Sequence, residues 1–427
     1  MALLILIYAA LPLLQAAVLL HSMTGFGMTA FEMLNYLSSV SAFHWLLANV
    51  LMGAKIPWFQ QAVPYDKRIR FHIYATFGII AAVGYHGIFK AAMHYYIDPV
   101  TWILIGVIAS FVSLAVLWIP VPGFRKIREA FLSRRKKMKE GSYDSSKKTH
   151  GILVLALSGL LLIHVVNSGI FFQVPAFSTA LYWFYYLTAV GLYAASLLGA
   201  FRAKAKVVSV EEKEGIVRLR LRVNPRFSYK SGQFAFVSIP GGEKGEHPFS
   251  FLSHETVDGK DTVTFAARRV GRFTAALSRL VPGDAVRIRG AFGDFRPRGS
   301  ERVCLIGSGI GTVPVISLLK ELYTQDEEKD VTAILSVEKR DEIPELSELL
   351  TFDADAGRAE RIAMHVLVRE EGHSLLTEEY FRATLAENMP DLYYVCSSPK
   401  VRRIVIDALR KLGVPKNSIR YESFAFA

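Results

Sequence analysis

The sequence predicts three consecutive parts: a membrane bundle of six α-helices, an antiparallel β-barrel and an α/β domain. Three observations support this fold class. The apolar excess of the 427-residue chain lies in its first 200 residues, the following hundred alternate polar and apolar residues, and the last third alternates strand-like and helix-like segments. We therefore expect a helical domain at 1–200, a barrel domain at 201–298 and an α/β domain at 299–427.

Six apolar runs in the first part are long enough to cross a bilayer, which requires about 20 residues per helix. They lie at 3–20, 30–53, 71–92, 100–120, 150–172 and 179–200. The first run has no basic segment before it and no clear small-residue cleavage site. We therefore interpret it as a retained span rather than a signal peptide.

The basic residues predict the orientation of these spans. The stretch 121–149 holds ten Lys or Arg against three acidic residues, whereas 21–29 and 173–178 carry no charge. Because basic loops remain in the cytoplasm, both termini and the two C-terminal domains are expected there, with the chain as a multi-pass protein of the cell (plasma) membrane. The formal net charge of +12 is then mainly a topology signal. No nucleic-acid partner is expected, because the basic loops lack interleaved aromatic residues.

The basic run Arg125–Lys139 has two interpretations. It is either a solvated loop or an amphipathic surface helix that docks on the C-terminal domains or on anionic lipid.

Two histidine pairs with the same spacing are the strongest site signal. His72 and His86 lie fourteen residues apart in one apolar run, and His150 and His164 lie fourteen apart in another. Fourteen residues make about four helical turns, so the members of a pair share a helix face about 21 Å apart. Two such helices side by side would place His72 opposite His150 and His86 opposite His164. Each histidine alone could be a buried structural residue, but together they predict iron ligands of two b-type haems.

The barrel region holds two candidate flavin-binding motifs. One is a strand end with a proline, an aromatic ring and a hydroxyl group, and the other is a basic glycine turn before a helix. The first comprises His247, Pro248, Phe249 and Ser250, and the second Arg268, Gly271, Arg272, Phe273 and Thr274. The strand could lie against an isoalloxazine ring with Ser250 bonded to its polar edge. The glycine turn at a helix N-terminus suits a pyrophosphate, so FAD is the expected cofactor.

The α/β region begins with an apolar strand that runs into a glycine-rich turn and a helix, as in dinucleotide-binding folds. The residues expected to bind the nucleotide there are Gly307, Gly309, Gly311, Thr312 and Pro314. The next strand ends before Lys339 and Arg340, where the ribose or its 2′-phosphate is read. These cations favour NADPH, and NADH remains an alternative. A later strand, Leu392–Val395, delivers Cys396 to the same edge of the sheet.

On these motifs, the chain resembles the NADPH oxidase and ferric reductase family over essentially its whole length. The resemblance implies a six-helix haem domain joined to a ferredoxin-reductase-like dehydrogenase. It implies that the two barrel motifs bind FAD and that the glycine-rich turn and Cys396 bind the nicotinamide nucleotide. It further implies that Phe424, or alternatively Phe426, stacks on the flavin and moves when nicotinamide enters. Phe424, Cys396 and Ser250 are therefore the candidate catalytic residues.

Two departures from larger family members narrow the expectation. The sequence contains no EF-hand loop before the first span and no long proline-rich tail. The chain therefore resembles a compact bacterial member that works without protein activators. The expected electron acceptor outside the membrane is molecular oxygen, with superoxide as product. A ferric chelate, or another membrane protein that receives the electrons, is the alternative.

Overall fold

The structure is a computed structural model of the whole chain. It describes residues 6–22, 27–60, 62–94, 99–118, 142–172, 174–224, 227–243, 245–257, 260–297, 302–324, 329–347, 349, 362–373, 376–385 and 388–422. The chain divides into two compact units. The first consists of Met1–Lys55 with Lys67–Ala200, and the second of Ile56–Asp66 with Phe201–Ala427. Each unit is described by itself.

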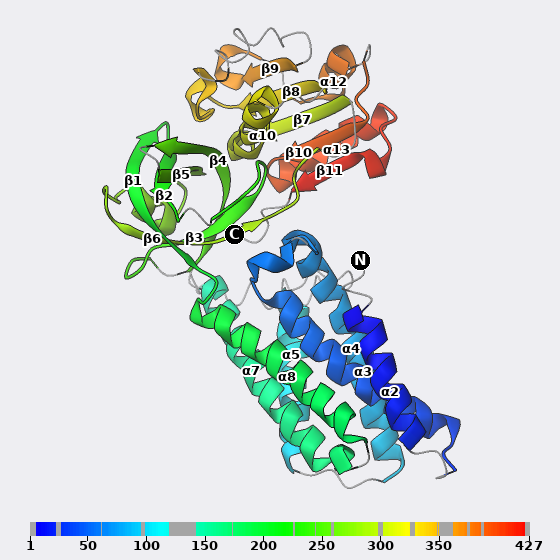
Figure 1. The fold of residues 1–427 in the computed structure, drawn as a ribbon. Coiled ribbons are helices and arrows are strands. Elements are labelled where there is room, and N and C mark those ends of the chain that lie inside the picture. Colours follow the sequence, from blue (N-terminus) through cyan, green and yellow to red (C-terminus); the bar gives the residue numbers. More distant parts are fainter. Residues whose placement is uncertain are drawn as a thin grey trace. The chain divides into compact units, whose positions relative to one another are not determined.

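The first unit is a bundle of helices that lie side by side (Figure 1). Its helical elements are η1 (Leu6–Ala10), α2 (Leu11–Ser22), α3 (Ala30–Gly53), α4 (Tyr65–Ala92), α5 (Pro99–Trp118), α7 (Ser142–Asn167), η3 (Ile170–Phe172) and α8 (Ala176–Leu198). The ends of two helices have clear local causes. Thr29 and Glu32 form a capping box at the start of α3, and Gly199 ends α8 in the left-handed conformation with φ 88°.

Three helical segments in the described part of the chain are long and apolar enough to cross a membrane. They are Lys67–Ala92, Thr149–Asn167 and Ala176–Leu198, while Leu6–Ser22 and Pro99–Ile108 are apolar but shorter. All six expected runs contain helix, but six spans are not demonstrated by length and composition. Polar residues along α3, including Asn35, His44 and Asn49, lower the apolar character of the second run. The basic run Arg125–Lys139 lies outside the described residues.

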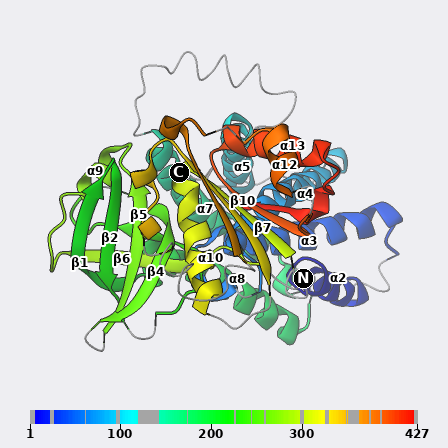
Figure 2. The ribbon, with the colours of Figure 1, turned by 90° about the horizontal axis from the view of Figure 1, so that it is seen from above.

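The second unit contains a closed barrel of antiparallel strands in the order β1-β2-β5-β4-β3-β6. The strands are β1 (Ala203–Lys213), β2 (Ile216–Arg222), β3 (Phe234–Ser238), β4 (His247–Val257), β5 (Lys260–Arg268) and β6 (Ala285–Phe292), and the short helix α9 (Arg272–Leu277) follows β5. Alternate residues of the strands fill the barrel, as their period-2 pattern requires. Figure 2 shows the barrel and α9 from above.

A second sheet, of parallel strands in the order β11-β10-β7-β8-β9, completes this unit. Its strands are β7 (Arg302–Ser308), β8 (Asp330–Val337), β9 (Ile362–Val368), β10 (Leu392–Cys396) and β11 (Ile419–Glu422). Its helical elements are η4 (Gly309–Gly311), α10 (Thr312–Thr324), η5 (Arg340–Glu342), η6 (Arg369–Glu371), α12 (Glu378–Leu385), α13 (Pro399–Lys411) and η7 (Lys416–Ser418).

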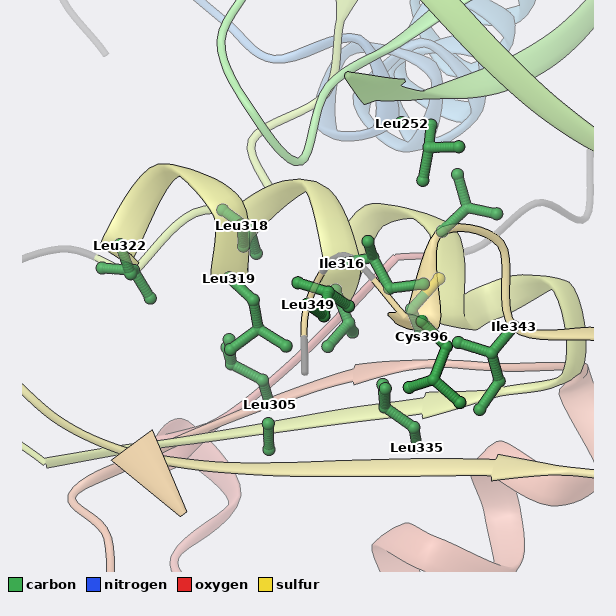
Figure 3. Packing of buried hydrophobic residues seen from close by; sticks show 14 of the residues in the cluster. Leu252, Leu305, Ile316, Leu318, Leu319, Leu322, Leu335, Ile343, Leu349 and Cys396 are labelled. Carbon is green, nitrogen blue, oxygen red and sulfur yellow. The ribbon is translucent and has the colours of Figure 1, made fainter. Parts of the chain in front are cut away.

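Helices cover both faces of this sheet. Val303 and Leu305 of β7 belong to the core under α10, whereas Cys304 and Ile306 belong to the core that includes α12 and α13. Figure 3 shows the α10 side, where Leu319 points from the helix toward Leu305 of the sheet. Burial on both faces explains why β7 is continuously apolar, as is usual for parallel sheets.

The short segment Ile56–Asp66 packs with the second unit, although it lies between α3 and α4 in the sequence. It contains the 3-10 turn η2 (Pro57–Gln60). The Gln60 amide donates a hydrogen bond to the Gly293 carbonyl at 2.6 Å, and the Tyr65 ring lies 5.1 Å from the Phe292 ring. Nothing in the sequence of this loop indicated a contact with the barrel.

Candidate functional site

The four predicted histidines form two facing pairs between α4 and α7. The ring centres of His72 and His150 are 6.4 Å apart, and those of His86 and His164 are 6.3 Å apart. The planes of the two rings are nearly perpendicular in each pair, at 81° and 80°. The structure therefore brings together the residues that the fourteen-residue spacing predicted to meet.

The separation within each pair fits a single metal ion between the two rings. First-row metals bind an imidazole nitrogen at about 2 Å, so two such bonds and the two ring radii separate the ring centres by about 6 Å. Both observed separations match this value. Two facing imidazoles in an apolar helical bundle are a donor set that would suit a haem iron.

Hydrogen bonds to Nδ1 orient three of the four rings. His72 Nδ1 lies 2.9 Å from the Asn49 carbonyl, and His86 Nδ1 lies 2.9 Å from Asn35 Oδ1. His164 Nδ1 lies 3.0 Å from Thr101 Oγ1. A ring whose Nδ1 is hydrogen-bonded in this way presents Nε2 to a metal.

These orienting residues were not predicted. The signal that could have found them is a polar residue at ligand depth in an otherwise apolar helix, as for Asn35 in α3 and Thr101 in α5. His44, which belongs to neither pair, is buried and its ring stacks on Tyr185 at 5.2 Å.

In the second unit, β4 and α9 bring the two flavin motifs into contact. The His247 ring lies 4.0 Å from the Phe273 ring, and the Phe249 ring is stacked on Phe273 at 6.0 Å. Pro248 and the buried Ser250 lie on β4, opposite Phe236 and Phe234 of the neighbouring strand β3. The motif predicted as a flavin platform is thus a single packed surface of two elements.

The glycine turn before α9 is held by its own threonine. Thr274 Oγ1 accepts hydrogen bonds from the amides of Val270 and Gly271, both at 3.1 Å. Gly271 is the N-cap of α9, and Arg272, the first helical residue, is exposed. Thr274 and Phe273 therefore shape the turn from within, which leaves Arg272 as the basic side chain available to an anion at its surface.

Arg268 is engaged by a carboxylate of the α/β domain. Its guanidinium donates to both Glu342 oxygens, at 3.1 and 2.7 Å. The Glu342 side chain is only 7% exposed, so this ion pair joins the barrel to the parallel sheet. A contact between Arg268 and a pyrophosphate, as the sequence suggested, would require this pair to open.

The glycine-rich turn after β7 is pressed against the end of β10. A Cβ at Gly311 would lie 2.1 Å from the Cys396 carbonyl oxygen, and one at Gly307 would lie 2.8 Å from Thr312 Cα. Gly309 has φ +57°, which favours glycine. Thr312 and Pro314 are buried in the first turn of α10. Close backbone approach therefore requires glycine at 307 and 311, and the turn joins the two predicted nucleotide elements.

Strand register places Cys396 in a row with two other residues. Cys396 pairs with Gly307 on β7 and with Glu422 on β11. The thiol is fully buried, and its pKa is raised well above the usual value, first by burial and further by the Glu422 carboxylate. A protonated thiol is unreactive, so a role in packing against a nucleotide suits Cys396 better than nucleophilic chemistry.

Glu422 is a candidate site residue that the sequence analysis missed. It is 7% exposed, and its Oε1 lies 2.8 Å from the place of a Cβ on Gly293, at the end of β6. The sequence held no signal for it, because its place beside Cys396 follows from the pairing of β10 with β11. Phe424 and Phe426, the predicted flavin-stacking aromatics, lie outside the described residues.

Lys339 and Arg340 follow the end of β8, as predicted, separated from it by Glu338. Both side chains contact carboxylates. Lys339 Nζ lies 2.9 Å from Glu214, and Arg340 is paired through two nitrogens with Glu371. Hydrogen bonding to the Arg340 guanidinium holds the pKa of the Glu371 carboxyl below its usual range.

Barrel, parallel sheet and glycine turn together define a flavin-dependent oxidoreductase of the ferredoxin-reductase type. A family model described as a FAD-binding domain matches residues 200–287. A protein of Thermococcus kodakarensis, named as an electron transfer subunit of dihydroorotate dehydrogenase B (NAD(+)), is 30% identical over 220 residues, which cover 51% of this chain and 84% of that protein. Through this half, the chain belongs to the family of ferredoxin-reductase-like flavoproteins that contains these subunits.

Two further similarities have different extents. Respiratory burst oxidase homolog protein G of Arabidopsis thaliana is 23% identical over 426 residues, which cover 84% of this chain but only 48% of that protein. This chain thus spans about half the length of that relative, and a match over 84% of the chain extends into the helical unit. Among solved structures, Amycolatopsis cytochrome P450 reductase GcoB is 17% identical, with a TM-score of 0.46, covering 52% of this chain and 69% of that one.

Proposed function

We propose that the chain is a transmembrane NAD(P)H oxidase. In this proposal it takes electrons from cytosolic NADPH, passes them through FAD and two b-type haems, and delivers them to oxygen on the other side of the membrane, producing superoxide. The observation that carries the proposal is the pair of ring separations, 6.4 and 6.3 Å, in a chain that also contains a ferredoxin-reductase-like FAD module.

The residues of the second unit would bind and orient the reactants. The surface formed by His247, Phe249 and Phe273 would hold the flavin, and the turn at Gly307–Gly311 would hold the nucleotide pyrophosphate. A bound flavin accepts two electrons as a hydride and releases them one at a time, which suits transfer from a nicotinamide to haem. The Cys396–Glu422 row would then border the nicotinamide side of the site.

The residues of the first unit would hold the haems and set their depth. In the proposed orientation, His72 and His150 lie on the cytoplasmic side and His86 and His164 on the outer side. Both termini and the second unit would be cytoplasmic, in the cell membrane, and six spans would surround the haems. An inside-negative potential would favour outward transfer by about 2.3 kcal/mol per 100 mV.

Two alternative acceptors use the same relay. One is a ferric chelate outside the membrane. The other is a second membrane protein, with this chain as its electron-donating subunit. The second alternative is supported by relatives named as electron transfer subunits, including one from Methanocaldococcus jannaschii that is 28% identical over 196 residues, covering 45% of this chain and 68% of that protein.

Reduction of cytochrome c by the purified protein with FAD, haem and NADPH, with and without superoxide dismutase, tests the proposal. Dismutase should abolish most of the signal, and no activator protein should be needed. Rapid reduction of flavin and haem without a dismutase-sensitive signal would contradict the oxidase and favour one of the alternative acceptors. His94→Ala removes an exposed histidine outside the two pairs, so this variant should keep the full dismutase-sensitive signal and serves as a control.

A further inference from the structure

The carboxyl ends of β8 and β9 carry two charge triplets that face each other in register. Glu338, Lys339 and Arg340 follow β8, and Arg369, Glu370 and Glu371 follow β9. The strands are parallel, with Val337 opposite Val368. The next three positions of each strand therefore come opposite one another, with a charge of opposite sign in every position.

Three contacts follow this register. Arg369 Nη1 lies 3.2 Å from Glu338 Oε2, and Lys339 Nζ lies 3.9 Å from Glu370 Oε1. Arg340 binds Glu371 through two parallel hydrogen bonds, Nε to Oε1 at 2.8 Å and Nη2 to Oε2 at 2.6 Å. The backbone amide of Glu370 also donates to the Glu338 carbonyl at 3.1 Å, which holds the two turns together.

The position of these triplets along the sheet edge connects them with the nucleotide. In the strand order, Cys396 and Glu422 lie on one side of the glycine turn after β7, and β8 and β9 lie on the other. A dinucleotide whose pyrophosphate lies at that turn and whose nicotinamide lies toward Cys396 places its adenosine ribose over the ends of β8 and β9.

Arg340 is the cation best suited to a 2′-phosphate there. Its guanidinium donors Nε and Nη2 are already hydrogen-bonded to the Glu371 carboxylate. Planar bidentate geometry is what a guanidinium offers to a carboxylate and to a phosphate alike, so the two anions compete for the same donors. The pair is accessible for exchange, because the Arg340 side chain is 46% exposed and that of Glu371 is 38% exposed. Exposed pairs of this kind contribute little to stability, so a phosphate with more charge can displace the carboxylate.

We propose that Glu371 is a specificity-determining residue that competes with the 2′-phosphate of NADPH for Arg340. This inference rests on the proposed use of a nicotinamide nucleotide at this edge. Binding of NADPH requires Glu371 to release the guanidinium, whereas NADH, which has no 2′-phosphate, leaves the Arg340–Glu371 pair closed. Glu371 thus lowers the preference for NADPH that Lys339 and Arg340 alone would impose.

Calorimetric titration of the full-length protein with 2′,5′-ADP and with 5′-AMP tests this, because the two probes differ only in the 2′-phosphate. Glu371→Gln should tighten binding of 2′,5′-ADP about five- to tenfold and change that of 5′-AMP less than about twofold. Glu370→Gln removes the same charge from the neighbouring position, whose contact with Lys339 is longer at 3.9 Å, and should have the smaller effect. Adding Arg340→Gln to Glu371→Gln should abolish the gain.

Three results would overturn the inference. Unchanged 2′,5′-ADP affinity in Glu371→Gln means that the carboxylate does not compete. An equal gain for both probes, or an equal gain in Glu370→Gln, means a general charge effect. If neither probe binds the unmodified protein and NADPH does not reduce its flavin, both this inference and the proposed function fail. Normal flavin reduction together with either of the first two results overturns the role of Glu371 alone.

Discussion

The histidine pairs of the first unit and the nucleotide edge of the second are assembled by different rules. In the helices, a repeated spacing of fourteen residues brings His72 opposite His150 and His86 opposite His164. At the sheet edge, parallel register aligns Gly307, Cys396 and Glu422, which have no common spacing in the sequence. A site whose residues follow the helical period can be predicted from local sequence. A site whose residues are brought together by strand order can be predicted only when the sheet topology is known.

Within the first region, the two pairs differ in what orients them. His72 is hydrogen-bonded to a main-chain carbonyl, that of Asn49, whereas His86 is bonded to the side chain of Asn35. The ring separations are almost equal, so the ligands themselves do not distinguish the pairs. The difference implies that substitutions can alter the environment of the His86–His164 pair more readily than that of the His72–His150 pair.

The largest expected effect breaks one pair. In the proposed relay, His164→Ala would remove one of the two ligands of the outer haem and should abolish that haem, which would stop transfer to the external acceptor while flavin reduction by NADPH continues. The pyridine haemochrome assay should show one haem per chain instead of two. His94→Ala should retain both. Two haems in His164→Ala would contradict the assignment of this pair.

The matching disruption of the second region is Gly311→Ala. The added Cβ would lie 2.1 Å from the Cys396 carbonyl oxygen, so either the turn or the end of β10 must move. Misplacement of about 1 Å at such a site slows hydride transfer roughly 100-fold. Stopped-flow reduction of the flavin by NADPH measures the rate. Gly106→Ala on α5, where a Cβ meets nothing within 4 Å, should leave it unchanged.

A smaller effect tests the pair that joins the barrel to the parallel sheet. Arg268→Gln leaves the buried Glu342 carboxylate without its bidentate partner and should lower the free energy of unfolding by about 1–3 kcal/mol. Denaturant unfolding of the protein, with FAD affinity measured in parallel, separates two roles. A large loss of FAD affinity with unchanged stability would instead support the pyrophosphate contact that the sequence suggested for Arg268.

The smallest effect sharpens the contrast between the two histidine pairs. Asn35→Leu removes the acceptor at His86 Nδ1 and should raise the potential of the outer haem by on the order of 60 mV, equivalent to about a tenfold change in relative affinity for the two iron states. Asn49→Ala removes the side-chain hydrogen bonds to the His72 carbonyl and to Thr76 Oγ1 but keeps the main-chain carbonyl at His72 Nδ1, so it should shift the potential of the proposed inner haem much less. Potentiometric titration of both variants measures the difference; equal shifts would remove the contrast.

Motifs that depend on local chemistry were predictable. Gly307, Gly309 and Gly311 stand in a strand–turn–helix context, and the structure shows why two of them cannot carry a Cβ. The His247–Ser250 strand end and the glycine turn before Phe273 were each predicted as flavin motifs, but their direct contact is seen only in the structure. What was not predictable is which charges pair: Arg268 and Arg340 were assigned to phosphates, and both are held by carboxylates from other elements.

The sequence by itself determined the helical and strand segments, the histidine spacing and the glycine turns, because helical period, pleat and backbone freedom are local properties. Only the tertiary structure decided the partners of those residues. Asn35 at His86, Glu422 beside Cys396 and Glu371 on Arg340 are each brought in from a distant segment. Contacts of this kind depend on strand order and helix packing, to which many distant residues contribute together.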